Sequence, residues 1–324
     1  MTKWRPRAVL PGLGWTAAVA LPAWGLSRVV PLLGAPVLAI LLGVVASLVR
    51  RPPARAAPGV AFSATVLLQL AIVLLGSTLG LGHILRVGAR SLPVMLGTLA
   101  VALLGGAVIG RALRVSPRLR TLVGVGTGIC GASAIAAVSG IIEATQTEIA
   151  YAISTIFVFN VVAVILFPPL GRLFGMSQHG FGLWAGTAVN DTSSVVAAAY
   201  AFGHAAGAQA VVVKLTRTTL IIPIALALSV SRARGRPTRL VPPFLVLFVL
   251  ASVLDTVGVV GADARRVLAD VAVGLITIAL AAVGLGTDLA GMRRTGPRPL
   301  LLGALLWLAV ASASIGLQAL TRQL

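Results

Sequence analysis

Charged residues are scarce in this sequence, and acidic residues are the scarcest of all. Only 10% of the 324 residues are charged, with 7 Asp and Glu against 26 Lys and Arg, whereas 58% are hydrophobic and the mean hydropathy is +1.03. This composition lies far outside that of soluble globular proteins. It predicts an all-α polytopic membrane protein, since helices satisfy their own backbone hydrogen bonds in lipid.

The shortage of acidic residues leaves a net charge of +19. In a soluble protein such an excess would indicate a nucleic-acid partner. Here the Lys and Arg residues stand mostly in short clusters between apolar segments, so we interpret them as orientation signals and lipid-headgroup contacts. No nucleic-acid partner is expected.

Cysteine and histidine are also nearly absent. A single cysteine, Cys130, excludes an internal disulfide, and the three histidines are too scattered for a zinc site. The sequence has no Ser/His or Cys/His pair at matched depth and no phosphate loop, which argues against an intramembrane enzyme. We expect a protein that is not an enzyme and that has no metal site and no cofactor, apart from coupling to Na⁺ or H⁺.

No polar gap is long enough for a soluble domain, so residues 1–324 are expected to form one integral membrane transporter domain. About 20 apolar residues are needed to span a bilayer. On this measure we expect about eleven hydrophobic segments, at residues 9–30, 32–49, 59–82, 91–113, 119–142, 148–170, 178–203, 207–231, 240–261, 267–290 and 299–321.

The basic residues predict an orientation for these segments. If the N-terminus is cytoplasmic, 18 of the 26 Lys and Arg residues fall on the cytoplasmic side and 6 outside, with Lys214 and Arg217 inside a segment. The cytoplasmic clusters lie at residues 3–7, 50–55, 111–120, 172, 232–239 and 293–298. This bias predicts a cytoplasmic N-terminus.

Polar residues interrupt the segment at 178–203. Five of them are consecutive in the middle of an apolar stretch: Asn190, Asp191, Thr192, Ser193 and Ser194. Such groups at mid-bilayer depth are costly unless they face a bundle interior or a wet cavity. They are candidate ligands for a substrate or an ion.

A second copy of this pattern occurs 60 positions earlier. Residues 126–137 read G-T-G-I-C-G-A-S-A-I-A-A, and residues 186–197 read G-T-A-V-N-D-T-S-S-V-V-A. Paired segments with such interruptions indicate the substrate site of a secondary transporter. The first copy adds Thr127, Cys130 and Ser133 as candidates; the alternative is that small residues only allow close helix packing.

A longer-range echo relates residues 72–97 to residues 276–301, with G-L-G at 80–82 matching G-L-G at 284–286. The charge pattern gives these two copies opposite topology, which predicts an inverted repeat. The two central copies would also be inverted if each were re-entrant, whereas two crossing segments would point the same way. Both arrangements remain open at this point.

Asp191 could bind Na⁺ through its oxygens or carry a proton, or it could simply cap a half-helix that begins after it. Lys214 and Arg217 share a helix face, since they are three residues apart. Their expected partners are Asp191 or an anionic substrate, with snorkelling to the interface as the alternative. Free N–H groups at the half-helix starts would also favour an anion.

These motifs, together with A-Y-A-I-S-T-I at 150–156 and V-K-L-T-R at 213–217, resemble the YeiH family of bacterial inner-membrane proteins over essentially the whole chain. That family carries the label of sulfate exporters and is grouped loosely with cation/proton antiporters and bile-acid-type transporters. Many members have His, Gln and Pro where this chain has Asn190, Ser194 and Gly140. A proton-relay role for that His therefore does not carry over.

The residues and the resemblance together imply a secondary active transporter of a small anion, sulfate or a related oxyanion, coupled to H⁺ or Na⁺. A cation/proton antiporter is the alternative, and an intramembrane enzyme ranks below both. The expected location is a bacterial inner membrane, and the expected partners are the small anion, the lipid bilayer and a second copy of the chain in a homodimer.

Overall fold

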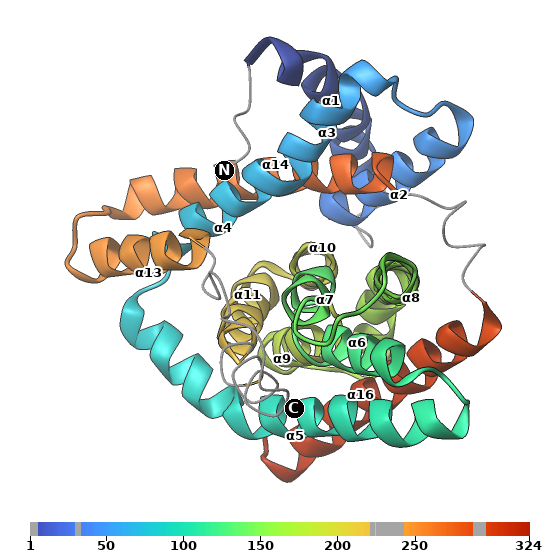
Figure 1. Cartoon of the computed structure of the whole chain (residues 1–324). Helices are drawn as coiled ribbons and strands as arrows, with labels where there is room; N and C mark the ends of the chain where they lie inside the picture. The colour runs from blue at the N-terminus through green and yellow to red at the C-terminus, as the bar shows by residue number, and fades with distance from the viewer. Residues whose placement is uncertain (1–5, 30–33, 221–223, 225–242, 288–295) are drawn as a thin grey trace. The chain divides into compact units, whose positions relative to one another are not determined.

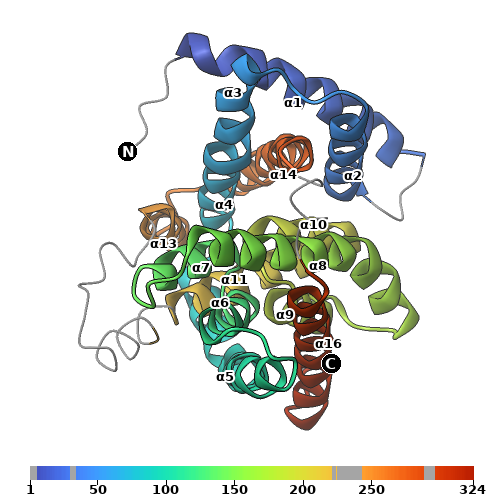
Figure 2. The same ribbon diagram turned by 45° about the vertical axis from the view of Figure 1, so that its right-hand side comes forward.

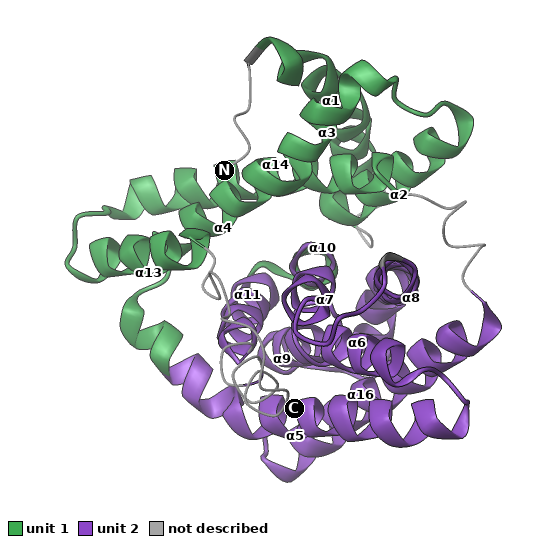
Figure 3. Cartoon of the chain, viewed as in Figure 1, with its two compact units in different colours: residues 1–85, 196–204, 243–287 green, residues 86–195, 205–242, 288–324 purple. Residues whose placement is uncertain are grey.

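The structure is a computed structural model that describes residues 6–29, 34–220, 224, 243–287 and 296–324. Every regular element in these ranges is a helix, which confirms the all-α prediction (Figure 1). The chain forms two compact units (Figure 3): residues 1–85, 196–204 and 243–287 in one, and residues 86–195, 205–242 and 288–324 in the other.

Six helical stretches in the described ranges are long and apolar enough to cross a membrane. They are α1 (Pro6–Ser27), the continuous stretch Ala54–Gly76, α5 (Leu81–Ala112), α8 (Gln146–Leu173), α14 (Ala262–Leu285) and α16 (Pro297–Leu320). Ala54–Gly76 is composed of η1 (Ala54–Ala56), α3 (Ala57–Phe62), the π-helical turn η2 (Ser63–Leu67) and α4 (Leu68–Gly76). Shorter helices occupy the other expected segments: α2 (Gly34–Val49), α6 (Pro117–Gly128), α7 (Ala132–Ser139), α9 (Gln178–Ala188), α10 (Thr192–Phe202), α11 (His204–Thr219) and α13 (Pro243–Thr256).

Each expected segment thus contains a helix or a pair of helices. The number of membrane crossings and the inverted repeat remain predictions. Several predicted features lie outside the described residues: Lys3 and Arg5 in the first basic cluster, the whole cluster at 232–239, Arg293 and Arg294, and the end of the segment 207–231.

In the first unit, α14 packs against α1, α2 and α4, and α13 packs against α4 (Figure 2). The contact between α2 and α14 requires glycine on both sides. A Cβ added to Gly43 would lie 2.6 Å from the Ala281 carbonyl oxygen and 3.0 Å from the Gly284 Cα. The two backbones therefore touch, as is common where small residues line a helix contact in a membrane.

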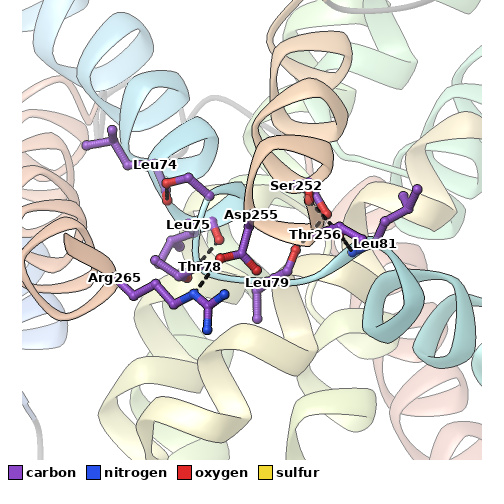
Figure 4. A network of polar contacts seen from close by, with 10 residues as sticks. Leu74, Leu75, Thr78, Leu79, Leu81, Ser252, Asp255, Thr256 and Arg265 are labelled. Atoms are coloured by element: carbon purple, nitrogen blue, oxygen red, sulfur yellow. Dashed lines mark hydrogen bonds and ion pairs between the residues drawn. The ribbon is translucent and has the colours of Figure 1, made fainter. Parts of the chain in front are cut away.

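Polar contacts fasten the turn between α4 and α5 to α13 (Figure 4). The Ser252 hydroxyl donates to the Leu79 carbonyl oxygen at 2.6 Å, and the Leu81 N–H donates to Thr256 Oγ1 at 2.7 Å. Both bonds satisfy backbone groups that the end of one helix and the start of the next leave without partners.

Two pairs of acidic and basic side chains lie in α13 and α14 within the described residues, and one of them is largely buried. Arg265 Nε lies 2.5 Å from Asp255 Oδ1, and the Asp255 side chain is only 6% exposed. The pair between Asp263 and Arg266, at 3.9 Å, is almost fully exposed. Only the first pair has surroundings in which losing one partner would strongly affect stability.

In the second unit, α16 packs against α6, α8 and α9. Aromatic rings fill this contact: Phe167 of α8 stacks on Trp184 of α9 with centroids 4.0 Å apart, and it also stacks on Trp307 of α16. The Trp184 indole N–H donates to the Ala311 carbonyl oxygen at 3.1 Å. These contacts fix the position of α9, the helix that leads into the predicted polar interruption.

Candidate functional site

The first interruption lies between α6 and α7. α6 ends at Gly128, and three residues follow before α7 begins at Ala132. Gly131 has φ 67° and ψ −128°, a region that residues with a Cβ rarely enter. A Cβ on Gly126 would lie 2.9 Å from the end of the Ile135 side chain. Nine residues of continuous helix would separate their Cα atoms by about 13.5 Å, so the chain bends sharply at this break.

The second interruption lies between α9, which ends at Ala188, and α10, which begins at Thr192. Asp191 Oδ1 accepts hydrogen bonds from the Ser194 backbone N–H, at 2.9 Å, and from the Ser193 hydroxyl. Asp191 therefore caps α10, as one of the two interpretations of this residue predicted. Asp191 as a whole residue is half-buried.

The two interruptions lie against each other. A Cβ on Gly131 would be 3.3 Å from the Asp191 Cβ and 3.6 Å from its Cα. Gly131 and Asp191 are also equivalent positions when the two sequence copies are aligned with their offset of 60 residues. The copies recognised in the sequence therefore meet at the point where each helix is broken.

The Lys214 side chain joins the two interruptions. Its ammonium group donates to the Ile129 carbonyl oxygen and to the Val189 carbonyl oxygen, both at 2.9 Å. Ile129 and Val189 are the C-cap residues of α6 and α9, and they too are equivalent in the two copies. A helix C-terminus carries partial negative charge, so a cation between two such ends is well placed.

Lys214 is completely buried, which shows that snorkelling to the interface is the wrong interpretation of its position. The expected charge partner Asp191 makes no direct contact with this ammonium group in the described residues. Within the described residues, no ion pair joins Asp191 to Lys214 or to Arg217. The lysine instead uses backbone carbonyl oxygens, which no side-chain pattern reveals.

Arg217, one helical turn further along α11, is also completely buried. Its Nη1 donates to the Thr187 carbonyl oxygen in the last turn of α9. Its Nε and Nη2 have no hydrogen-bond partner among the described residues. Unsatisfied buried donors are costly, and those on a charged group are the most costly, so these two positions call for an explanation.

Two buried acceptors are open as well. Asn190 donates its backbone N–H to Asn160 Oδ1 at 3.1 Å, but its own Oδ1 has no partner among the described residues. The same is true of the Thr127 hydroxyl, whereas its equivalent Thr187 bonds to Ser314 Oγ at 2.7 Å. The two sequence copies therefore differ in how many of their buried polar groups have hydrogen-bond partners. The groups without partners belong to the predicted site residues.

The remaining candidates differ in exposure. Cys130 and Ser194 are buried, Thr192 and Ser193 are half-buried, and Ser133 is exposed in the first turn of α7. That turn has no side-chain cap. The structure shows no hydrogen bond from the side chains of Thr127, Cys130 or Ser133 to the other candidates in the described ranges.

Sequence reasoning missed three contributors to this arrangement. One is Asn160, whose Oδ1 accepts a hydrogen bond from the backbone N–H of Asn190. The carbonyl oxygens of Ile129 and Val189 carry no sequence signal of their own. The alignment of the two copies, which makes these two residues equivalent, was the one signal that could have found them.

Apolar spans and two interrupted helices that meet at buried cations define a multi-pass integral membrane protein of the kind in which broken helices form a central polar site. Comparison with known sequences identifies the family to which the chain belongs. The family model described as "Conserved hypothetical protein 698" matches residues 11–303. The chain belongs to this UPF0324 family of membrane proteins, which confirms the YeiH-type resemblance.

Similar proteins occur in distant bacteria, each named a UPF0324 membrane protein. The relative from Streptococcus pyogenes serotype M6 is 43% identical over 326 residues, covering 95% of this chain and 96% of the relative. The relative from Streptococcus agalactiae serotype V is 39% identical, covering 96% and 97%. The relative from Fusobacterium nucleatum is 39% identical, covering 93% and 94%. The similarity therefore extends over the whole length of the chain.

Proposed function

We propose that this protein is a secondary active transporter of a small anion, sulfate or a related oxyanion, and that it exports this anion. The observation that carries the proposal is the environment of the Arg217 side chain. Its guanidinium group is completely buried beside the interruptions, and its Nε and Nη2 donors have no partner among the described residues. This pair of donors has the forked geometry that binds two oxygens of one oxyanion.

The charge of the site supports an anion. Lys214 and Arg217 bring two cations to the interruptions, against one carboxylate from Asp191. In addition, α7 begins without a side-chain cap, at Gly131. The N–H groups of an uncapped helix start attract anions through the helix dipole, and the exposed Ser133 could add a hydroxyl donor there.

The carboxyl group of Asp191 is the candidate for coupling to H⁺ or Na⁺. It is half-buried, it is surrounded by hydroxyl and amide groups, and it lies against Gly131 at the contact between the two breaks. An anion site beside an ionised carboxylate is unfavourable unless a cation or a proton accompanies the anion. That requirement is a physical reason for coupled transport.

The proposed topology places the protein in a bacterial inner membrane with its N-terminus in the cytoplasm. We interpret the α6–α7 and α9–α10 pairs as re-entrant or interrupted segments of an inverted repeat of about eleven hydrophobic segments. The sharp bend at Gly126–Ile135 supports this interpretation for the first pair. Broken helices of this kind are tolerated at membrane depth when protein covers them.

The test is uptake of labelled sulfate into proteoliposomes that contain the purified protein, under an imposed pH or sodium gradient. Arg217→Gln should lower sulfate binding or flux at least about 100-fold, since it removes two charge-assisted hydrogen bonds to the anion. Arg111→Gln, which changes an exposed arginine in the last turn of α5, is the matched control and should behave as the unmodified protein. Equal effects of the two substitutions would contradict the role of Arg217.

A cation/proton antiporter is the second candidate, and the observation that favours it is the half-buried Asp191 at the start of α10. In that case Asp191 would carry the ion, and Lys214 and Arg217 would supply counter-charge. Proton efflux from vesicles on addition of Na⁺ or K⁺, in the absence of any transported anion, would select this candidate over the anion transporter.

A further inference from the structure

The position of the Lys214 ammonium group is unusual for a lysine in a polar site. It lies 2.9 Å from each of two carbonyl oxygens, and both belong to C-cap residues at the ends of interrupted helices. In transporters with interrupted helices, unwound carbonyl groups and half-helix C-termini are the groups that coordinate the coupling cation. The ammonium group of Lys214 therefore lies where a free cation would be expected.

We propose that Lys214 is a covalently attached cation that fills the cation site at the meeting point of the two interruptions. The protein then needs no Na⁺ to hold the ends of α6 and α9 together. This inference deepens the proposed function, because it excludes Na⁺ from the point between the ends of α6 and α9 and leaves the carboxyl group of Asp191 as the place where a coupling H⁺ or Na⁺ would bind. The proposal that Lys214 fills a cation site does not depend on whether the protein transports an anion.

The symmetry of the ligands supports a cation site over an incidental contact. Ile129 and Val189 are equivalent in the two sequence copies, so one nitrogen receives the same backbone group from each copy. The partial negative charge of both helix ends acts on the same point. The lysine is completely buried, and its two hydrogen bonds are both to protein carbonyl oxygens.

Removing the amine should therefore leave a vacant site for a small monovalent cation. In Lys214→Ala, two buried carbonyl oxygens lose their donor while the negative helix ends remain. Carbonyl oxygens are ligands for Na⁺ and K⁺ in membrane proteins. A free cation that binds only the folded state stabilises it by mass action, with an effect that grows with its concentration.

The experiment measures the melting temperature of the full-length protein in detergent, in chloride salts of Na⁺, K⁺, methylammonium and the bulky N-methyl-D-glucamine at equal ionic strength. Asp191→Asn, which retains Lys214 but lacks the carboxylate proposed for coupling, should melt at the same temperature in all four salts. Lys214→Ala should melt about 5–10 °C lower in N-methyl-D-glucamine and recover at least half of that loss, saturably, with a small cation. Arg111→Ala, which removes an exposed cation, should show neither effect.

Two results would overturn the proposal: saturable stabilisation by Na⁺ of Asp191→Asn, which retains Lys214 but lacks the carboxylate, or equal melting of folded Lys214→Ala in every salt. Because Lys214→Ala could fail to fold, binding of radioactive ²²Na⁺ to Asp191→Asn provides a measurement that does not depend on that variant. Absence of saturable binding supports the filled site, and binding refutes it. Neither readout depends on sulfate flux, so a failure of the anion-transport proposal would be seen separately, in proteoliposomes.

Discussion

Gly131→Ala tests whether the two interruptions must touch. The backbone of Gly131, with φ 67° and ψ −128°, is one that alanine adopts only with strain, at a cost of about 1–3 kcal/mol. The new methyl group would also lie 3.3 Å from the Asp191 Cβ, which is tighter than an ordinary contact. Overpacking in a well-packed region adds about 1 kcal/mol. The expected loss of stability is therefore about 2–4 kcal/mol, by summing the two.

The assay is thermal unfolding of the purified protein in detergent, where this loss corresponds to a decrease in melting temperature of about 5–10 °C. Gly140→Ala is the matched control. Gly140 is the C-cap of α7 with φ −68°, and an added Cβ there meets nothing within 4 Å. Its substitution should change stability by no more than about 0.5 kcal/mol.

A double-mutant cycle separates the cost of backbone strain at Gly131 from the cost of overpacking against Asp191. Asp191→Gly removes the Cβ that the new methyl group would meet, but it leaves the backbone strain at Gly131 unchanged. The double variant should therefore be less destabilised than the sum of the single variants, by about 0.5–1.5 kcal/mol. Additive losses would show that the two breaks are not in contact, and unchanged melting of Gly131→Ala would refute both parts of the reasoning.

Two further substitutions test single contacts. Asp191→Asn should abolish gradient-driven flux in proteoliposomes while it changes the melting temperature little, because asparagine caps a helix about as well as aspartate; normal coupled flux would exclude Asp191 as the coupling group. Arg265→Met should destabilise the protein by about 2 kcal/mol more than Asp255→Asn in thermal unfolding, because it leaves a carboxylate unpaired whose side chain is only 6% exposed. Equal losses would show that water reaches Asp255.

The interruptions could be predicted from the sequence because polar residues and glycines are unusual in the middle of an apolar helix. Asp191 with two serines after it is a helix start in the middle of an apolar run, and glycine at 128 and 131 permits a break that other residues resist. The helices on either side were also predictable from apolar length. The π-helical turn at Ser63–Leu67 was not, because nothing in an apolar run marks a change from four-residue to five-residue hydrogen bonding.

The partners of the buried cations could not be predicted, for a physical reason. Side-chain pairing leaves a pattern of opposite charges in the sequence, and the pattern suggested Asp191 for Lys214. Backbone carbonyl oxygens are present at every residue, so only the fold determines which of them are free. In Ile129 and Val189 they are free because each helix ends there, and they face the lysine because the breaks meet.

Lys214 and Arg217 lie on the same face of α11, yet the structure gives them different positions in the site. The Lys214 ammonium group is bonded to both interrupted helices, so any rearrangement that separated Ile129 from Val189 would have to break at least one of its two hydrogen bonds. Within the described ranges, Arg217 is bonded to α9 through Thr187, and two of its donors have no partner. In the proposed transport cycle, the lysine would therefore resist separation of the breaks, while the arginine would be free to gain an anion. A charge-conserving exchange, arginine at 214 or lysine at 217, should not preserve these roles, since a forked guanidinium and a compact ammonium group satisfy different sets of oxygens.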